Sequence, residues 1–175
     1  MESRNVQELT ICQAQPQHLD ELRRIFTYAK AFMSAHGNPT QWSGSYPSDE
    51  VVMADILAQE CFLCIDEQGD ACGCFSLKKG EEPTYAYIEG AWGDDSPYLT
   101  IHRLASNGKR HGVADAAIRY AKRQGEQIRI DTHQDNLTMR HILNKHGFIF
   151  CGTIYVRDGS ARFAYRVSQD CKKNQ

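Results

Sequence analysis

Residues 98–125 constrain the fold of this 175-residue chain more than any other segment, because two kinds of element meet there across a short loop. Residues 98–105 are rich in β-branched, aromatic and leucine side chains and lead into Asn107-Gly108, a pattern typical of a strand closed by a turn. From Gly112 onward the apolar residues recur at helical spacing, and Gly125 then ends the pattern. The segment therefore predicts a buried strand, a tight loop and an amphipathic helix packed on a sheet. The apolar helix positions are Val113, Ala116, Ala117, Tyr120 and Ala121.

The loop between this strand and this helix has the composition of a phosphate-binding site. No Ser, Thr or Asp stands immediately before the helix to cap its first N–H groups, and Gly112 leaves the backbone open to a ligand. Lys109, Arg110 and His111 place basic side chains in the same turn. Free amides at a helix N-terminus carry about half a positive charge and attract anions. A solvated basic loop is the alternative interpretation.

Two motifs carry a resemblance to a known family. Lys109-x-x-Gly112-x-Ala114 resembles the Arg/Gln-x-x-Gly-x-Gly/Ala pyrophosphate loop of the GNAT superfamily of N-acetyltransferases, with Lys in the leading position. Residues 128–148, IRIDTHQDNLTMRHILNKHGF, are similar to the family's later strand, its Asn-initiated helix and the end of that helix. The strings Glu89-x-x-Trp92 and His102-Arg103-Leu104-Ala105 resemble a subgroup of small bacterial members.

The order of predicted elements agrees with this resemblance: strand, two helices, three strands, helix, strand, helix and two strands. The GNAT fold implied is a single α/β (α+β) domain over residues 1–175, with a mixed sheet of six to seven strands, helices on both faces and a frayed tail at 169–175. A helical connection makes strands 98–105 and 127–133 parallel. In the family these two strands splay apart to admit the pantetheine arm. The other predicted elements are a strand at 8–14, a helix from Pro16 to about Gly37, a helix capped by Ser48, a hairpin of 61–66 and 71–77, a helix capped by Asp135, and strands at 149–157 and 161–167.

Composition limits the classes of function. A hydrophobic content of 41% is enough for one core, and a net charge of -2 gives no general attraction to nucleic acid or anionic membranes. No segment approaches the ~20 apolar residues of a membrane span, and the N-terminus lacks the apolar core of a signal peptide, so a cytoplasmic protein is expected.

Seven cysteines, an odd number, predict reduced thiols rather than a disulfide framework. Cys61, Cys64, Cys72 and Cys74 raise the alternative of a zinc site. A regular strand, however, places Cys72 and Cys74 on one face and Cys61 and Cys64 on opposite faces. We therefore expect buried strand cysteines and no metal.

The resemblance implies acetyl-coenzyme A as co-substrate and assigns residues to it. The pyrophosphate would lie on the loop and the helix start, the pantetheine arm would follow the strand, and Asn136 would donate a hydrogen bond to that arm. Lys145 completes the set from the later helix. The cofactor-binding candidates are thus Leu104, Ala105, Ser106, Lys109, Arg110, His111, Gly112, Val113, Ala114, Asn136 and Lys145.

The catalytic groups are less determined. Many family members carry Tyr as a general acid at the position that matches Leu143, and leucine cannot donate a proton. Tyr155 and His133 are candidate substitutes, or the thiolate leaves unassisted, since a thiol pKa near ~8.5 makes it a good leaving group. Glu89 is the first candidate for the general base and His102 the second. Their alternatives are a loop carboxylate in solvent and a core histidine.

The acceptor is expected to meet the two irregular segments, 37–47 and 79–97. Trp42, Tyr46 and Trp92 in these segments, with Glu89, suit a cationic and partly apolar amine, although the same rings could fill the edge of the core. The predicted activity is transfer of acetyl from acetyl-coenzyme A to an amine of a small molecule or peptide by direct attack. The alternative is an acyl-coenzyme A binding module without turnover, favoured by Leu143, in a monomer or a homodimer. A phosphate-loop hydrolase is excluded, because the chain has no Gly-x-x-x-x-Gly-Lys-Ser/Thr.

Overall fold

A computed structural model describes residues 8–168, so the tail expected to fray from Gln169 lies outside the described residues. The element order is as predicted, with one additional strand. In chain order the elements are β1 (Thr10–Gln13), the 3-10 turn η1 (Pro16–His18), α1 (Leu19–Ala35), α2 (Asp49–Leu57), β2 (Cys61–Ile65), β3 (Ala71–Lys79), η2 (Pro83–Tyr85), β4 (Glu89–Gly90), β5 (Tyr98–Ser106), α3 (Val113–Lys122), β6 (Gln127–Thr132), α4 (Leu137–Lys145), β7 (Ile149–Tyr155) and β8 (Ala161–Val167).

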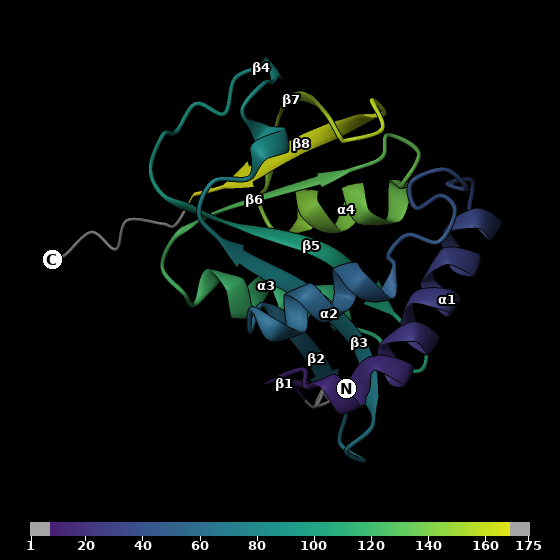
Figure 1. Ribbon diagram of the computed structural model, residues 1–175. Helices are drawn as coiled ribbons and strands as arrows, with labels where there is room; N and C mark the ends of the chain where they lie inside the picture. The colour runs from purple at the N-terminus through teal and green to yellow at the C-terminus, as the bar shows by residue number, and fades with distance from the viewer. Residues whose placement is uncertain (1–7, 169–175) are drawn as a thin grey trace, which may run out of the picture.

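The strands form one mixed sheet in the order β1-β2-β3-β5-β6-β8-β7-β4 (Figure 1). Helices α1 and α2 cover one face and α3 and α4 the other, which confirms the predicted α/β layering. The described sheet has eight strands rather than six or seven, because Glu89 and Gly90 pair with Thr153 and Gly152 of β7. A Cβ on Gly90 would lie 2.2 Å from the Cys151 carbonyl oxygen, so only glycine allows this close pairing.

Each face of the sheet carries its own hydrophobic core. Ile101, Ile118 and Leu143 belong to the core on the α3 side, whereas Leu22 and Ile56 belong to the core beneath α1 and α2. A third cluster consists of Tyr85, Trp92, Ile154 and Ala164. It anchors the long β3–β5 connection on the α1–α2 face of the far half of the sheet.

Strands β5 and β6 are parallel, as predicted, and they separate early (Figure 1). They pair only from Tyr98–Gln127 to Thr100–Arg129, although β5 continues to Ser106 and β6 to Thr132. The two strands therefore part along the rest of their length, as the resemblance implied.

A β-bulge shapes β5 just beyond this point. Cys74 and Ser76 of β3 pair with Ala105 and His102, so two residues of β5, Arg103 and Leu104, lie opposite one residue of β3. Arg103 has φ 51°, a left-handed conformation that is uncommon for a residue with a side chain. The extra residue breaks the alternation of the strand at this point.

Two local predictions were wrong. Asn136 rather than Asp135 caps α4, since the Asn136 side chain accepts a hydrogen bond from the Met139 amide. Cys72 and Cys74 lie on opposite faces of the sheet, because the β2–β3 register shifts beside Cys72. The prediction for Cys61 and Cys64 is confirmed, since these two thiols belong to different cores.

Burial raises the pKa of the Cys61 and Cys64 thiols to about 12. Within residues 8–168 no three or more His, Cys, Asp or Glu side chains are grouped so that they could hold a metal ion. In the same part of the chain, every helix is too short or too polar to span a bilayer.

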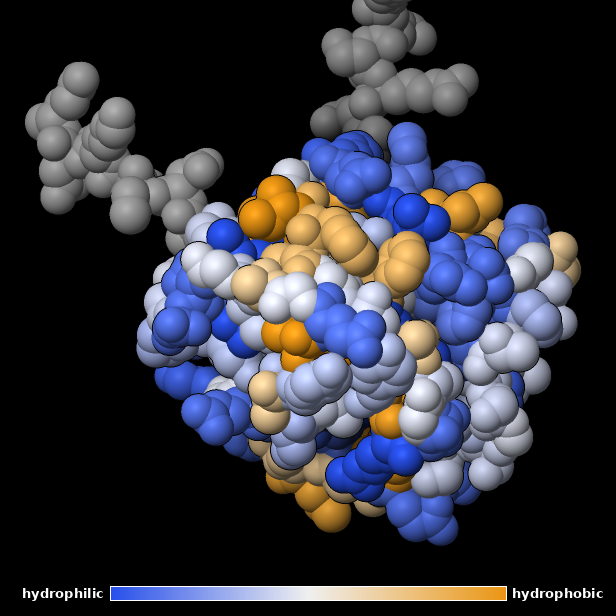
Figure 2. Space-filling view, turned by 90° about the horizontal axis from the view of Figure 1, so that it is seen from above, coloured by the Kyte–Doolittle hydropathy of each residue, from blue (hydrophilic) through white to orange (hydrophobic). Residues whose placement is uncertain are grey.

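The surface above β4 and β7 is mixed in polarity. Viewed from the top of Figure 1, apolar side chains gather in small groups that hydrophilic residues interrupt (Figure 2). The exposed apolar residues of β7 are Ile149, Phe150 and Tyr155.

Gly73 provides a test of how closely α3 packs on the sheet. A Cβ at this position would lie 2.4 Å from Cγ1 of Val113 and 2.7 Å from the Ala105 carbonyl oxygen. We expect Gly73→Ala to lower the free energy of unfolding by about 1–3 kcal/mol, measured by urea denaturation. The cost should shrink in a Val113→Ala background, which removes one of the two clashes, and strictly additive costs would contradict this packing.

Candidate functional site

A cleft of ≈ 810 Å³ opens where β5 and β6 part. Its lining comes from the end of α1, the α1–α2 loop, α2, the end of β3, the β3–β4 connection, β5, β6, the start of α4, the β7–β8 turn and β8. Segments far apart in the sequence thus surround one space. Of the predicted site residues, Trp42, Tyr46, His102, Leu104 and Asn136 line it.

The predicted phosphate loop lies at the C-terminal end of β5. Gly112 is the N-cap of α3 with φ 93° and no side-chain capping bond, and a Cβ placed there would have no neighbour within 4 Å. Asn107 shapes the loop, because its side chain donates to the Ala71 carbonyl and accepts from the Lys109 amide. The predicted uncapped and open helix start is therefore confirmed as a structural feature.

Charged residues surround this helix start. Arg110 donates to Glu67 of the β2–β3 hairpin at 3.2 Å, and Lys145 forms an ion pair with Asp115 at 3.0 Å. Asp115 also contacts His146 Nε2 at 2.6 Å. Burial would raise the pKa of Asp115, but the hydrogen bonds from His146 and Lys145 outweigh it and lower that pKa. Lys145 thus lies beside the first turn of α3, with its charge paired to this carboxylate.

The unpaired part of β5 faces the far end of β6. Leu104 lines the cleft, Ala105 is buried and the Ser106 hydroxyl accepts from the Gly108 amide. Asn136 donates to the side-chain oxygen of Gln41 at 2.9 Å. Gln41 was not among the predicted site residues, and only its place in the irregular segment 37–47 pointed to it.

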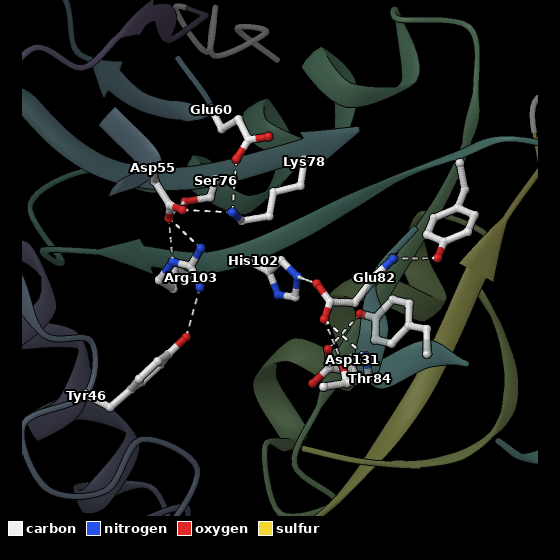
Figure 3. A network of polar contacts seen from close by, with 12 residues as sticks. Tyr46, Asp55, Glu60, Ser76, Lys78, Glu82, Thr84, His102, Arg103 and Asp131 are labelled. Atoms are coloured by element: carbon white, nitrogen blue, oxygen red, sulfur yellow. Dashed lines mark hydrogen bonds and ion pairs between the residues drawn. The ribbon is translucent and has the colours of Figure 1, made fainter. Parts of the chain in front are cut away.

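His102 and Glu82 form a hydrogen-bonded pair in the cleft (Figure 3). His102 Nε2 lies 2.9 Å from Glu82 Oε2, and both side chains are less than a fifth exposed. Glu82 Oε1 accepts from both the amide and the hydroxyl of Thr84. The hydrogen bond from His102 is the main cause that lowers the pKa of Glu82 to about 2, so the carboxylate stays ionised. Sequence reasoning missed Glu82, although it lies in the segment expected to be functional.

A second polar group joins β5 to α2 (Figure 3). Arg103 Nε donates to Asp55 Oδ2 at 2.7 Å, and Arg103 Nη1 donates to the Tyr46 hydroxyl at 3.0 Å. Asp55, which is 3% exposed, also accepts from Ser76 and pairs with Lys78. Burial would raise the pKa of Asp55, but the charge of Arg103 and these hydrogen bonds keep it below its ordinary value.

A third carboxylate lies on the cleft side of β6. Asp131 Oδ1 accepts a hydrogen bond of 2.7 Å from the Tyr85 hydroxyl. Tyr85 is buried, and its ring lies 6.4 Å from the His102 ring. Asp131 and the pair His102–Glu82 thus surround the same part of the cleft (Figure 3).

Three of the predicted catalytic and acceptor-site residues, Glu89, Tyr155 and Trp92, do not line the cleft. Glu89 is exposed on β4 at the edge of the sheet, and its hydrogen bond to Tyr155 raises the pKa of that tyrosine. Trp92 is 8% exposed and packs in the third cluster, where its indole N–H donates to the Tyr85 carbonyl. Glu89 and Trp92 belong to the segment 79–97, which is expected from the sequence to meet the acceptor, whereas Tyr155 is a candidate acid from a later strand. Pairing of β4 with β7 carries Glu89 away from the cleft.

The other two positions considered for the general acid, Leu143 and His133, also lie outside the cleft lining. Leu143 is fully buried in the core on the α3 side, so this position faces the core and not the cleft. His133 follows the end of β6, and its ring lies 3.5 Å from Asp135. It does not belong to the cleft lining.

The geometry can be compared with known proteins. No protein-family model matches the chain, and no curated protein matches it. Among solved structures, the chain is similar to a GNAT-family acetyltransferase from Streptococcus agalactiae, with 30% identity over 94% of this chain and 98% of that chain and a TM-score of 0.83. A GNAT-family acetyltransferase from Listeria monocytogenes matches with 19% identity, 91% and 94% coverage and a TM-score of 0.69.

A more distant similarity includes the cofactor. The NatC complex bound to Gag peptide and CoA matches with 14% identity, 92% coverage of this chain and 98% of that chain, and a TM-score of 0.59. At this identity the match shows a common fold only.

The lowered pKa of Glu82 predicts a pH-dependent stability. Its ordinary carboxyl pKa is 4.5 and its folded pKa is about 2, so the ionised form stabilises the fold above pH 4.5, and this contribution disappears as the pH falls through about 2. The difference in unfolding free energy between the native protein and Glu82→Gln should therefore be constant above pH 4.5 and shrink below it. Urea denaturation across this pH range measures it, with the exposed neighbour substitution Glu81→Gln as control. Equal pH dependence in both variants would sink the assignment.

Proposed function

The chain belongs to the GNAT family of acetyltransferases, and on this premise we propose that it transfers an acetyl group from acetyl-coenzyme A to an amine of a small molecule or peptide. One observation carries the proposal. The cleft between the parted strands β5 and β6 contains the His102–Glu82 pair, and β5 leads from there directly to the uncapped start of α3. A cofactor site and a proton acceptor therefore share one strand.

The residues of this chain fit acetyl-coenzyme A. The helix start offers uncapped amides, and the open space at Gly112 admits a diphosphate close to the backbone. Lys109 and the amides of residues 110–114 would hold the diphosphate, while Leu104, Ala105, Ser106 and Asn136 would hold the pantetheine arm. When bound, the cofactor supplies an acetyl group activated as a thioester.

His102 is the proposed general base. The ionised Glu82 carboxylate can only accept a hydrogen bond, so His102 Nε2 carries the hydrogen between them. The lone pair of Nδ1 then remains to accept a proton from the attacking amine. Glu82 is a positioning residue, because it fixes the ring orientation and stabilises the imidazolium that forms.

The bulge at Arg103 and Leu104 is the proposed place of oxyanion stabilisation. A strand N–H beyond the last β5–β6 pair is a donor for the developing oxyanion, in the part of β5 that β6 leaves free. Neither position predicted for a tyrosine acid faces the cleft, since Leu143 is buried and Tyr155 lies outside it, so the thiolate would leave unassisted. A thiol pKa near ~8.5 makes that departure feasible.

Release of free thiol tests the activity. The protein is incubated with acetyl-coenzyme A and a panel of polyamines, amino acids, aminoglycosides and peptides, and thiol is followed with time. Stabilisation by the cofactor together with no thiol release from any acceptor would favour the acyl-coenzyme A binding module and contradict the enzyme.

Gly112→Asp tests the cofactor site. Its carboxylate would meet the diphosphate at a helix N-terminus, so we expect the affinity for coenzyme A, measured by calorimetry, to fall by about tenfold or more. Gly125→Asp is the matched control, because Gly125 follows the other end of α3 and also combines a positive φ with open surroundings. Undiminished affinity in Gly112→Asp would remove the diphosphate from this loop.

His102→Asn tests the general base. We expect kcat to fall by about 10²- to 10⁴-fold, because the proton acceptor is lost, while the affinity for coenzyme A stays unchanged. Glu82→Gln should lower kcat less and shift the pH profile of kcat/KM. Glu89→Gln decides between the two candidate bases, and a loss of activity in Glu89→Gln with an active His102→Asn would contradict the mechanism.

A further inference from the structure

Arg162 of β8 is a buried cation that lines the cleft, and β6 lies between its strand and β5, which carries His102. Arg162 is 6% exposed. Its guanidinium donates to the Gln41 carbonyl at 2.8 Å, the Ser160 hydroxyl at 3.0 Å and the Ala161 carbonyl at 3.1 Å. All three acceptors are neutral, and Arg162 forms no ion pair within residues 8–168.

The carboxylate nearest in sequence, Asp158, forms no direct ion pair with this cation within residues 8–168, although hydrogen bonds from Ser160 and, to a smaller extent, the charge of Arg162 lower its pKa. Asp158 is exposed in the β7–β8 turn, and its Oδ1 accepts from the amide and the hydroxyl of Ser160. Arg157 of the same turn lines the cleft as well. A buried cation with no direct ion pair is uncommon in proteins unless a ligand supplies the anion.

Asp131 is the matching anion. Its only hydrogen bond within the described chain comes from the neutral Tyr85 hydroxyl, and it forms no ion pair there. Asp131 pairs with Ala164 across β6 and β8, so Arg162 is its diagonal neighbour on the same face of the sheet. Residues in such diagonal positions are about 7–8 Å apart, and their Cβ atoms are somewhat closer. One face of the cleft thus carries a cation and an anion that do not neutralise each other.

A third polar group that lines the cleft has no hydrogen-bond partner within the described residues. The Thr100 hydroxyl is buried and makes no hydrogen bond within residues 8–168. Thr100 precedes His102 by two residues on β5, at the last position where β5 and β6 pair. An unbonded buried hydroxyl costs free energy, and a polar ligand in the cleft would satisfy it.

From these three groups we propose that the acceptor is a small amino acid, a molecule that carries both an amine and a carboxylate. Arg162 binds the carboxylate, for which its planar fork is suited. Asp131 attracts the ammonium to the part of the cleft where His102 takes its proton. This inference rests on the proposed acetyltransferase function and narrows its substrate class.

Recognition of such a zwitterionic acceptor also explains why the cleft contains both a cation and an anion without an ion-pair partner. Asp55 is already paired with Arg103, and the Glu82 carboxylate already accepts hydrogen bonds from His102 and Thr84, so both carboxylates are engaged within the protein. Arg162 and Asp131 remain for recognition. A polyamine would leave Arg162 without a partner and place a second cation near it, which disfavours that class of acceptor.

Matched acceptors test the proposal. Several amino acids, each with its own methyl ester, are assayed by thiol release with the native protein and with Arg162→Gln. We expect Arg162→Gln to raise KM for the free amino acids by about 30-fold or more and to change KM for the esters by less than about threefold. Arg162→Lys, which keeps the charge but loses the fork, should give an intermediate KM.

Controls separate recognition from folding. Arg123→Gln removes an exposed arginine at the C-cap of α3 that does not line the cleft, and it should leave both KM values unchanged. The melting temperature and the affinity for coenzyme A are measured for every variant, since Arg162 also contacts the segment around Gln41. If Arg162→Gln does not fold, KM for the amino acids is compared with KM for their esters in Arg162→Lys alone.

The outcomes distinguish this inference from the proposed function. Equal effects of Arg162→Gln on amino acids and esters would assign Arg162 to holding the α1–α2 loop and overturn the inference. Efficient acetylation of esters and simple amines, with slow turnover of amino acids by the native protein, would also overturn it while leaving the acetyltransferase intact. Absence of thiol release with every acceptor would overturn the proposed function itself.

Discussion

The ion pair between Arg103 and Asp55 holds the irregular part of β5 on which the cleft depends. Arg103 occupies a left-handed backbone conformation within a strand, which costs free energy. The hydrogen bonds of its guanidinium to the nearly buried Asp55 carboxylate of α2 and to the Tyr46 hydroxyl offset this cost. Because Asp55 also binds Ser76 and Lys78 of β3, one carboxylate joins a helix to two strands.

The bulge determines which side chains face the ligand. In a regular strand, His102 and Arg103 would point to opposite faces of the sheet. One extra residue lets both side chains line the same cleft, while Leu104 also packs against the core on the α3 side. The bulge follows the last β5–β6 pair, so the strand that presents His102 also keeps backbone groups free for a cofactor.

The charged residues of the cleft fall into two groups, those paired within the protein and those without an ion pair. Asp55 and Glu82 have lowered pKa values because each accepts hydrogen bonds from a cationic or polar partner in the protein. These pairs shape the site and orient the imidazole. Arg162 and Asp131 stay outside them, and this separation of structural from unpaired charges is the basis on which we infer the acceptor.

Local patterns predicted much of the fold but little of the acceptor site. The strand–loop–helix segment, the Ser48 cap and the Asp-Gly turn at Asp158-Gly159 depend on neighbouring residues, and the structure confirms them. The contact of Gln41 with Asn136 spans 95 residues, and no periodicity could have indicated it. Glu89 is the first base predicted from the sequence because a carboxylate near the cleft is a usual choice, yet Gly90 and Gly152 allow the residue to join the edge of the sheet instead.

The sequence by itself determined that an uncapped glycine opens a helix after a buried strand, because caps, turns and periodicity are properties of adjacent residues. The sequence also excluded a general acid at the position where many family members carry tyrosine, since Leu143 has no proton to donate. Only the tertiary structure decided that Glu82, and not Glu89, meets His102. The direction of a side chain in an irregular segment is set by packing, here by Tyr85 and Trp92 against the far half of the sheet.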